Sequence, residues 1–183
     1  MQQFWRRGYH ATTTRDLESS LGINQSSLYN AFGSKSELAD AAIERYQARL
    51  DERLFQPLIE AEDGFAAVDQ FFRKIERWLL EDGRGCLMGR LMGEGAARDP
   101  RVADRLSIYR DSLANALSAA LTTAAYLGEI SRASVGSRTQ VLVGAVFGLN
   151  MAVQANLGPD AISSMAAATR REVADWRAAG VAA

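Results

Sequence analysis

The chain has few residues that impose covalent or conformational constraints. Cys86 is its only cysteine, so no disulfide can form within the chain and no cysteine-rich zinc site is possible. The residues after it are Leu87 and Met88, and this apolar setting predicts a thiol used for packing rather than redox sensing. Only three prolines occur, and no alternating Val, Ile and Thr runs indicate strands. Together with much Ala, Leu and Arg, this composition predicts an all-α protein.

The chain also lacks the residue sets that catalysis and metal binding use. His10 is its only histidine, and nothing in the sequence pairs it with Cys86 or a spaced serine as a nucleophile. No Gly-rich phosphate loop or cluster of metal ligands is present. Glu94 and Asp99 lie near glycines and are interpreted as helix-end charges. We therefore predict no enzymatic activity, no cofactor and no metal site.

The chain also lacks a large excess of charge of either sign. The formal net charge is −1 over 183 residues, which excludes a protein that binds polyanions by bulk electrostatics. Residues 1–35 nevertheless hold four basic and two acidic side chains, a local excess of two positive charges. A small basic face of this kind suits a protein that contacts phosphate groups locally.

One long segment, residues 139–159, has no charged side chain, a feature that a membrane span would share. The segment contains Gln140, Asn150, Gln154 and Asn156, and no basic cluster flanks it. A buried helix at an interface is therefore the better interpretation. No signal peptide is visible, and we expect a cytoplasmic protein.

Residues 13–38, TTRDLESSLGINQSSLYNAFGSKSEL, have the layout of a helix-turn-helix DNA-binding motif. The turn is centred on Gly22, because glycine tolerates the backbone angles of a sharp corner. We expect Thr14 to cap the first helix and Asn24 to cap the second. The apolar residues that should face inward are Leu17, Leu21, Leu28 and Phe32.

The outer face of the second helix then consists of short or planar polar groups, which suit base edges and phosphate oxygens. These residues are Gln25, Ser26, Ser27, Tyr29 and Asn30.

The N-terminal sequence resembles the DNA-binding domain of the tetracycline-repressor (TetR) family of bacterial transcriptional regulators. The residues that carry the resemblance are Phe4-Trp5, Gly8-Tyr9, Thr12-Thr13-Thr14, Gly22-Ile23, Leu28-Tyr29, Phe32, Ser34-Lys35 and Glu37-Leu38. Outside this region the chain is similar mainly in architecture, apart from the stretch GCLMGRLMGEGAARDP, which is similar to some members' regulatory domains.

The resemblance implies a role for each matching position. Gln25 and Ser26 would read bases, and glutamine can bind adenine through two hydrogen bonds. The positions expected to touch phosphates are Ser27, Tyr29, Thr14 and Lys35. Asn30 would reach either a base or the backbone.

The chain departs from the family pattern in three ways. Ala31 occupies a position where many members carry an aromatic residue or histidine, so one phosphate contact is absent. Glu18 and Leu21 replace small residues, and Glu18 would repel DNA unless it points away or pairs with Arg15. Only MQQFWRR precedes Gly8, so we expect a truncated first helix.

The resemblance and the helical periodicity together predict about nine helices in two domains. Residues 1–46 would form the helix-turn-helix domain, and residues 47–183 the helical regulatory and dimerisation domain. A long helix over residues 36–58 would join them. Further helices are expected over residues 64–81, 86–93, 101–127, 134–157 and 160–176, the last capped by Asp160.

The resemblance also implies partners. We expect a homodimer formed by helices 134–157 and 160–176, with Gly144 and Gly148 allowing close approach, bound to a palindromic operator. Packing within one subunit is the alternative for these glycines.

A small apolar or aromatic effector would release a repressor from DNA. The candidate effector-binding residues are Phe72, Trp78, Met88, Met92, Tyr109, Phe147, Asn150 and Met151. Ordinary core packing is the competing interpretation for each. The alternative for the whole chain is a helical ligand-binding or interaction protein without DNA binding.

Overall fold

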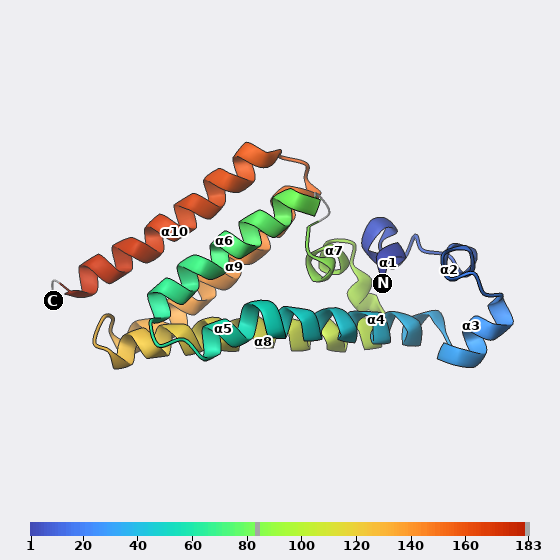
Figure 1. Cartoon of the computed structure of the whole chain (residues 1–183), viewed down its shortest axis with the longest axis horizontal. Helices are drawn as coiled ribbons and strands as arrows, with labels where there is room; N and C mark the ends of the chain where they lie inside the picture. The colour runs from blue at the N-terminus through green and yellow to red at the C-terminus, as the bar shows by residue number, and fades with distance from the viewer. Residues whose placement is uncertain (83–84, 182–183) are drawn as a thin grey trace. The chain divides into compact units, whose positions relative to one another are not determined.

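The computed structural model describes residues 1–82 and 85–181, and the regular elements among them are all helices (Figure 1). The chain divides into two compact units. The first unit is Met1–Arg49 together with Cys86–Tyr109, and the second is Leu50–Gly85 together with Arg110–Ala183. The all-helical prediction is confirmed for the described residues.

The first unit is built from short helices around an aromatic core. Its elements are α1 (Gln2–Arg7), α2 (Thr14–Leu21), α3 (Gln25–Phe32), α4 (Lys35–Leu50) up to Arg49, α7 (Leu87–Gly93), the 3-10 turn η2 (Ala96–Arg98) and the start of α8 (Pro100–Tyr126). Trp5 packs edge-on against Tyr46 with 5.3 Å between ring centroids. The Tyr46 hydroxyl donates to Cys86 Sγ at 3.4 Å and accepts from the Leu87 amide at 3.3 Å. These contacts attach α7 to α4.

The long helix predicted over residues 36–58 is present. It consists of α4, a five-residue π-helical turn η1 (Asp51–Phe55) and α5 (Gln56–Ile59). Leu50 and Gln56, at the two junctions, both have right-handed helical backbone angles, so one element continues into the next. Pro57 lies in the first turn of α5, directly after the π-helical turn. Counted as one helix, these three elements make nine α-helical segments in the described residues.

The second unit is a helical bundle. Its elements after α5 are α6 (Gly64–Asp82), the remainder of α8, the 3-10 turn η3 (Arg132–Ser134), α9 (Val135–Gln154) and α10 (Pro159–Val181). The predicted inner stripe of α6 is buried throughout, from Val68 to Leu79. On α8, Leu113, Leu117 and Leu121 are completely buried.

Helix α10 packs along α6 and α9 (Figure 1). Arg170 on α10 pairs with Asp69 on α6 at 2.6 Å, and Arg177 pairs with Glu129 at 2.6 Å. These ion pairs fix the register of α10 against its neighbours.

Several predicted details are wrong. The Leu21 side chain is 50% exposed and that of Phe32 is 39% exposed, so neither is a core residue of this chain. Helix α10 begins at Pro159 and continues to Val181, which places Asp160 inside the first turn rather than at the cap. No helix among the described residues has both the length and the apolar composition needed to span a bilayer.

Candidate nucleic-acid interface

The first helix of the motif, α2, is capped by Thr13. The Asp16 amide donates to Thr13 Oγ1 at 3.2 Å, and the Thr13 amide donates to the Asp16 carboxylate at 2.9 Å. This is a reciprocal capping box, with each residue accepting from the other's backbone. The prediction of Thr14 as the cap is therefore wrong. Of the three consecutive threonines, Thr13 is the one with an acidic residue three positions later.

The turn between α2 and α3 forms as predicted. Gly22 has φ 67° and ψ 25°, in the left-handed region that glycine occupies without steric cost, and its amide donates to the Glu18 carbonyl at 2.9 Å. Asn24 then caps α3, because its side-chain oxygen accepts from the Ser27 amide at 2.8 Å. The two helix ends therefore meet at a corner set by local hydrogen bonds.

Helix α3 buries one side chain and exposes a polar face. Leu28 is 3% exposed and, with the equally buried Leu17 of α2, supports the helix from behind. The predicted base- and phosphate-contacting residues Gln25, Ser26, Ser27 and Asn30 are all exposed. The Ser26 hydroxyl donates to Asn24 Oδ1 at 2.7 Å, so its oxygen remains an acceptor. The exposed groups on this face are uncharged hydrogen-bonding groups.

A second polar pair adjoins this face. The hydroxyl groups of Thr14 and Tyr29 are 3.0 Å apart, which links the start of α2 to the middle of α3. Both side chains are half-buried. Because each hydroxyl can both donate and accept, the pair can turn one proton toward an outside oxygen without losing the bond between them.

Lys35, at the start of α4, lies beside Tyr9. Its ammonium nitrogen is 4.7 Å from the centre of the Tyr9 ring and donates to the His10 carbonyl at 3.4 Å. Burial lowers the pKa of Lys35, while the charges of Glu94, Asp99 and Tyr29 oppose that shift. The cation is thereby held in a fixed place on the same unit as α3.

The other charges near the motif only partly cancel. Arg7 binds Asp16 at 2.7 Å. Arg15 and Glu18 make no ion pair with each other or with any other described residue. The charge of Glu18 is therefore not neutralised by Arg15, the partner that the sequence suggested.

Sequence reasoning missed a network that links Tyr9 to Asp99. The Asp99 carboxylate accepts from the Tyr9 hydroxyl, from Ser36 Oγ at 2.9 Å and from the Arg101 amide at 3.1 Å. Burial, together with the hydrogen bond to Asp99 and its charge, raises the pKa of Tyr9 to about 12. Asp99 also caps α8, as its position before Pro100 allowed, but no local pattern connects it to Tyr9, 90 positions earlier.

The predicted effector-binding residues are divided between the two units. Met88, Met92 and Tyr109 belong to the first unit, whereas the other five belong to the second. Phe72, Met88 and Tyr109 are buried, and the Asn150 amide donates to the Val146 carbonyl at 2.9 Å. Trp78 is half-buried and lines a cleft, Phe147 and Met92 are half-buried, and Met151 is exposed. Their role as an effector site remains a prediction.

These features define the first unit as a helix-turn-helix module with an exposed polar face on α3. Residues 1–42 match the family model for bacterial regulatory proteins of the tetR family. No curated protein sequence matches the chain.

Solved structures of TetR-type regulators share the fold over nearly the whole chain. The reduced form of NemR from E. coli has a TM-score of 0.81 and 19% identity, covering 93% of this chain and 90% of its own. A TetR-family regulator from Agrobacterium tumefaciens has a TM-score of 0.82 and 16% identity, with the same coverage. A cysteine mutant of CifR, complexed with 26bp double-strand operator DNA, has a TM-score of 0.82 and 22% identity, covering 92% and 90%. The chain therefore has the TetR regulator fold.

Proposed function

We propose that the protein is a sequence-specific DNA-binding transcriptional regulator, a repressor that a small molecule releases from its operator. The observation that carries this proposal is the exposed face of α3, where Gln25, Ser26, Ser27 and Asn30 stand on a helix whose only buried residue is Leu28. A helix with such a face fits the major groove, where amide and hydroxyl groups read base edges. Such a protein acts on chromosomal DNA, so we place it in the cytoplasm.

The polar groups around α3 fall into two roles. Gln25, with Ser26 beside it, would read bases, while Asn30 would reach a base or the backbone. Ser27, the Thr14–Tyr29 pair and Lys35 would hold phosphates and fix the register of α3. Operator binding by CifR, a protein of the same fold, supports this assignment. In this scheme residues 1–46 bind DNA and residues 47–183 bind the effector and a second copy of the chain.

A homodimer would place two copies of α3 on one palindromic site. On α9, Val141 and Met151 are 53% and 48% exposed, and Gly144 between them has no atom within 4 Å of where a Cβ would stand. These three positions share one helical face. Gly148 lies next to Met165 of its own chain, as the alternative of packing within one subunit expects. We assign the dimer contact to the exposed face of α9, with α10 beside it.

Release by an effector requires that the second unit affects the first. Two helical elements run through both units: α4 with η1 and α5, and α8. Helix α8 begins at Pro100, directly after its capping residue Asp99. Asp99 accepts a hydrogen bond from Tyr9, and the Tyr9 ring lies against Lys35. A ligand that favours a different position of α8 would thereby weaken a phosphate contact.

Replacing Lys35 with glutamine tests the phosphate role. We expect Lys35→Gln to weaken DNA binding about equally for all sequences, and to reduce the slope of log affinity against log salt concentration by about 1. The control is Arg132→Gln, which removes one positive charge at an exposed position of the second unit, outside the motif. Fluorescence anisotropy with duplex DNA at several salt concentrations measures both quantities. An unchanged slope for Lys35→Gln would remove Lys35 from the interface, and no binding by the wild type would favour the DNA-independent alternative.

A further inference from the structure

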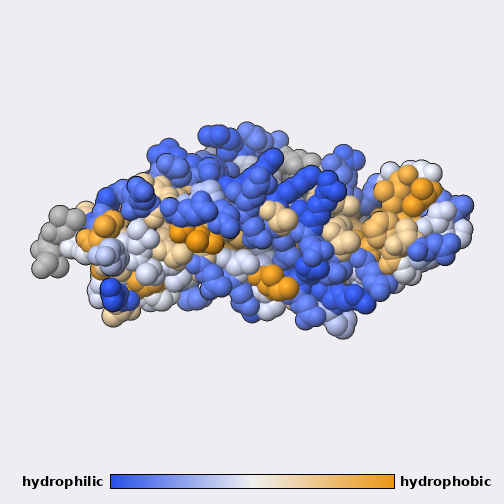
Figure 2. Space-filling view, turned by 60° about the horizontal axis from the view of Figure 1, so that its bottom comes forward, coloured by the Kyte–Doolittle hydropathy of each residue, from blue (hydrophilic) through white to orange (hydrophobic). Residues whose placement is uncertain are grey.

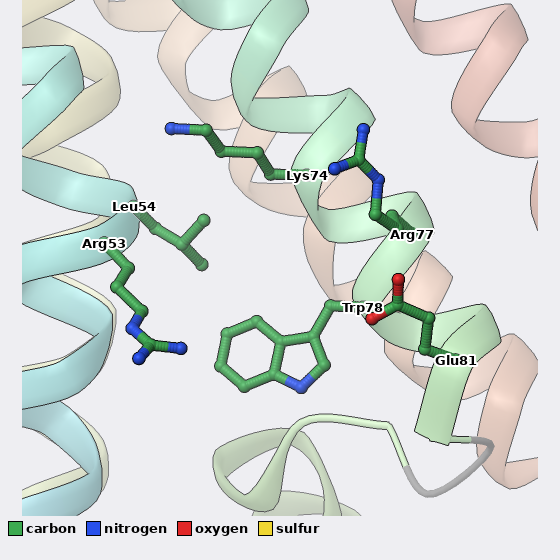
Figure 3. A pocket seen from close by; sticks show the side chains of 6 residues that line it. All are labelled: Arg53, Leu54, Lys74, Arg77, Trp78 and Glu81. Atoms are coloured by element: carbon green, nitrogen blue, oxygen red, sulfur yellow. The ribbon is translucent and has the colours of Figure 1, made fainter.

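The second unit contains a cleft of about 580 Å³ between η1 and α6. Its lining residues are Arg53, Leu54, Lys74, Arg77, Trp78 and Glu81. The four that come from α6 are spaced three, one and three positions apart, so they share one face of that helix. Figure 3 shows the Trp78 indole reaching from α6 toward Arg53 and Leu54. Lys74 also extends from α6 toward the helical turn that carries these two residues. A volume of this size lies within the usual range for small-molecule sites.

The cleft is strongly positive in a chain whose net charge is −1. Three cations and one carboxylate line it, for a formal charge of +2. Arg53, Lys74 and Arg77 have no ion-pair partner among the described residues. Elsewhere in the same unit, Arg73, Arg170 and Arg177 are each bound to a carboxylate. Within the described residues no carboxylate forms an ion pair with the three cations of the cleft. Their hydrogen-bond donors can therefore bind an anion.

The cleft also has an apolar part. Leu54 is 7% exposed and the Trp78 side chain is half-buried, and both line the cleft together with the charged groups. Arg53 and Leu54 both belong to the π-helical turn, a rare feature that often marks functional sites because it redirects side chains. An aromatic ring can stack on an indole here while its acidic group meets the arginines.

We propose that this cleft binds an aromatic organic acid, whose ring packs on Trp78 and Leu54 and whose carboxylate binds Arg53, Lys74 and Arg77. Guanidinium groups bind a carboxylate through two parallel hydrogen bonds, which a neutral amide of the same shape cannot match. We further propose that this acid is the effector of the regulator, and this part rests on the proposed function. Binding of the acid to the cleft does not depend on whether the protein binds DNA.

The test uses acid and amide pairs of matched shape: benzoate and benzamide, 2-naphthoate and 2-naphthamide, 4-phenylbutanoate and its amide. Isothermal titration calorimetry of the full chain without DNA should show at least one acid binding about tenfold more tightly than its amide. Arg77→Gln should weaken that acid by about tenfold and leave the amide unchanged. Arg73→Gln, on the same helix but outside the cleft and paired with Asp69, should change neither.

Two further variants separate ligand contact from a change of fold. Glu81→Gln removes the one carboxylate in the cleft and should tighten acid binding roughly two- to threefold. Trp78→Leu should weaken acid and amide alike, because it removes the stacking surface. The proposal is overturned if no acid binds more tightly than its amide, or if Arg73→Gln and Arg77→Gln have the same effect.

The same variants distinguish this proposal from the proposed function. Acid binding that depends on Arg77, in a protein that binds no DNA, would support the cleft and reject the regulator. DNA binding without any preference of the protein for acids over amides would reject the cleft and keep the regulator. DNA release by the acid, lost in Arg77→Gln, would support both.

Discussion

Replacing Gly64 with alanine will lower the free energy of unfolding of the second unit by about 1–3 kcal/mol, the range for overpacking a close contact. Gly64 is the buried first residue of α6, and a Cβ there would collide with the main-chain carbonyl of Ala120 in α8. Ala120 is completely buried within its helix, so its carbonyl cannot turn away as a flexible side chain would. Urea denaturation followed by circular dichroism measures the change.

The matched control is Gly136→Ala. Gly136 lies in α9, is exposed, and has no atom within 4 Å of the added methyl position. Alanine should therefore stabilise the helix there by about 0.5–1 kcal/mol, the difference in helix propensity. Equal stability of Gly64→Ala and wild type would show that α6 and α8 are not as closely packed as described.

Replacing Asp99 with alanine will destabilise the first unit by about 2–4 kcal/mol and weaken DNA binding. The substitution leaves the hydroxyl groups of Tyr9 and Ser36 without their acceptor, and Tyr9 is only 8% exposed. It also frees the ring against which Lys35 lies. Asp104→Ala is the control, since Asp104 is exposed on the same helix and its side chain makes no hydrogen bond or ion pair with another described residue. Thermal unfolding and DNA titration of both variants give the comparison.

The contribution of Asp99 should also disappear in acid. Burial acts to raise the pKa of Asp99, but hydrogen bonds from Tyr9, Ser36 and two backbone amides outweigh it and hold the pKa below its ordinary value. A carboxylate with a lowered folded-state pKa stabilises the protein above about pH 4 and loses that effect as the pH falls through the lowered pKa. The difference in stability between wild type and Asp99→Ala should therefore shrink as the pH falls from about 4 through the lowered pKa. A constant difference down to pH 2 would show that the carboxylate charge has no part in the network.

The fold was largely predictable because its signals are local. Asn24 caps α3 and Gly22 forms the turn, and each makes its hydrogen bond to a residue only a few positions away in the sequence. The inner stripe of α6, Val68 to Leu79, follows from helical spacing alone. Such features depend on residues that are close in the sequence and not on contacts with distant segments.

Helical spacing could not predict which apolar residues are covered by other parts of the chain. Leu21 and Phe32 lie four positions after Leu17 and Leu28 and were expected to be buried with them, yet both are substantially exposed. Each of them is the last residue of an eight-residue helix and is followed by the glycine that ends it. The apolar side of each of these helices is therefore only partly buried. Figure 2 shows apolar groups exposed on one face of the molecule.

The candidate sites divide in the same way. The polar face of α3 is visible in the sequence because all its residues belong to one helix. Asp99 and Tyr9 are far apart in sequence, and the cleft combines Arg53 with the face of α6 that carries Trp78. The π-helical turn that redirects Arg53 breaks the 3.6-residue period, so periodicity could not assign its side chains to that cleft.

Selection of bound fragments from a random pool of duplex DNA, made with the wild type, Gln25→Ala and Gln70→Ala, tests the reading of DNA by α3 most directly. We expect the wild type to select a palindrome whose half-sites are about 34–36 Å apart, as a dimer requires. Gln25→Ala should relax the preference at one base pair of each half-site by about 1–3 kcal/mol. Gln70→Ala, an exposed glutamine on α6, should leave it unchanged. A wild type that enriches no sequence, or a Gln25→Ala variant that selects the same sequence with the same stringency, would contradict the assignment of α3 as the recognition helix.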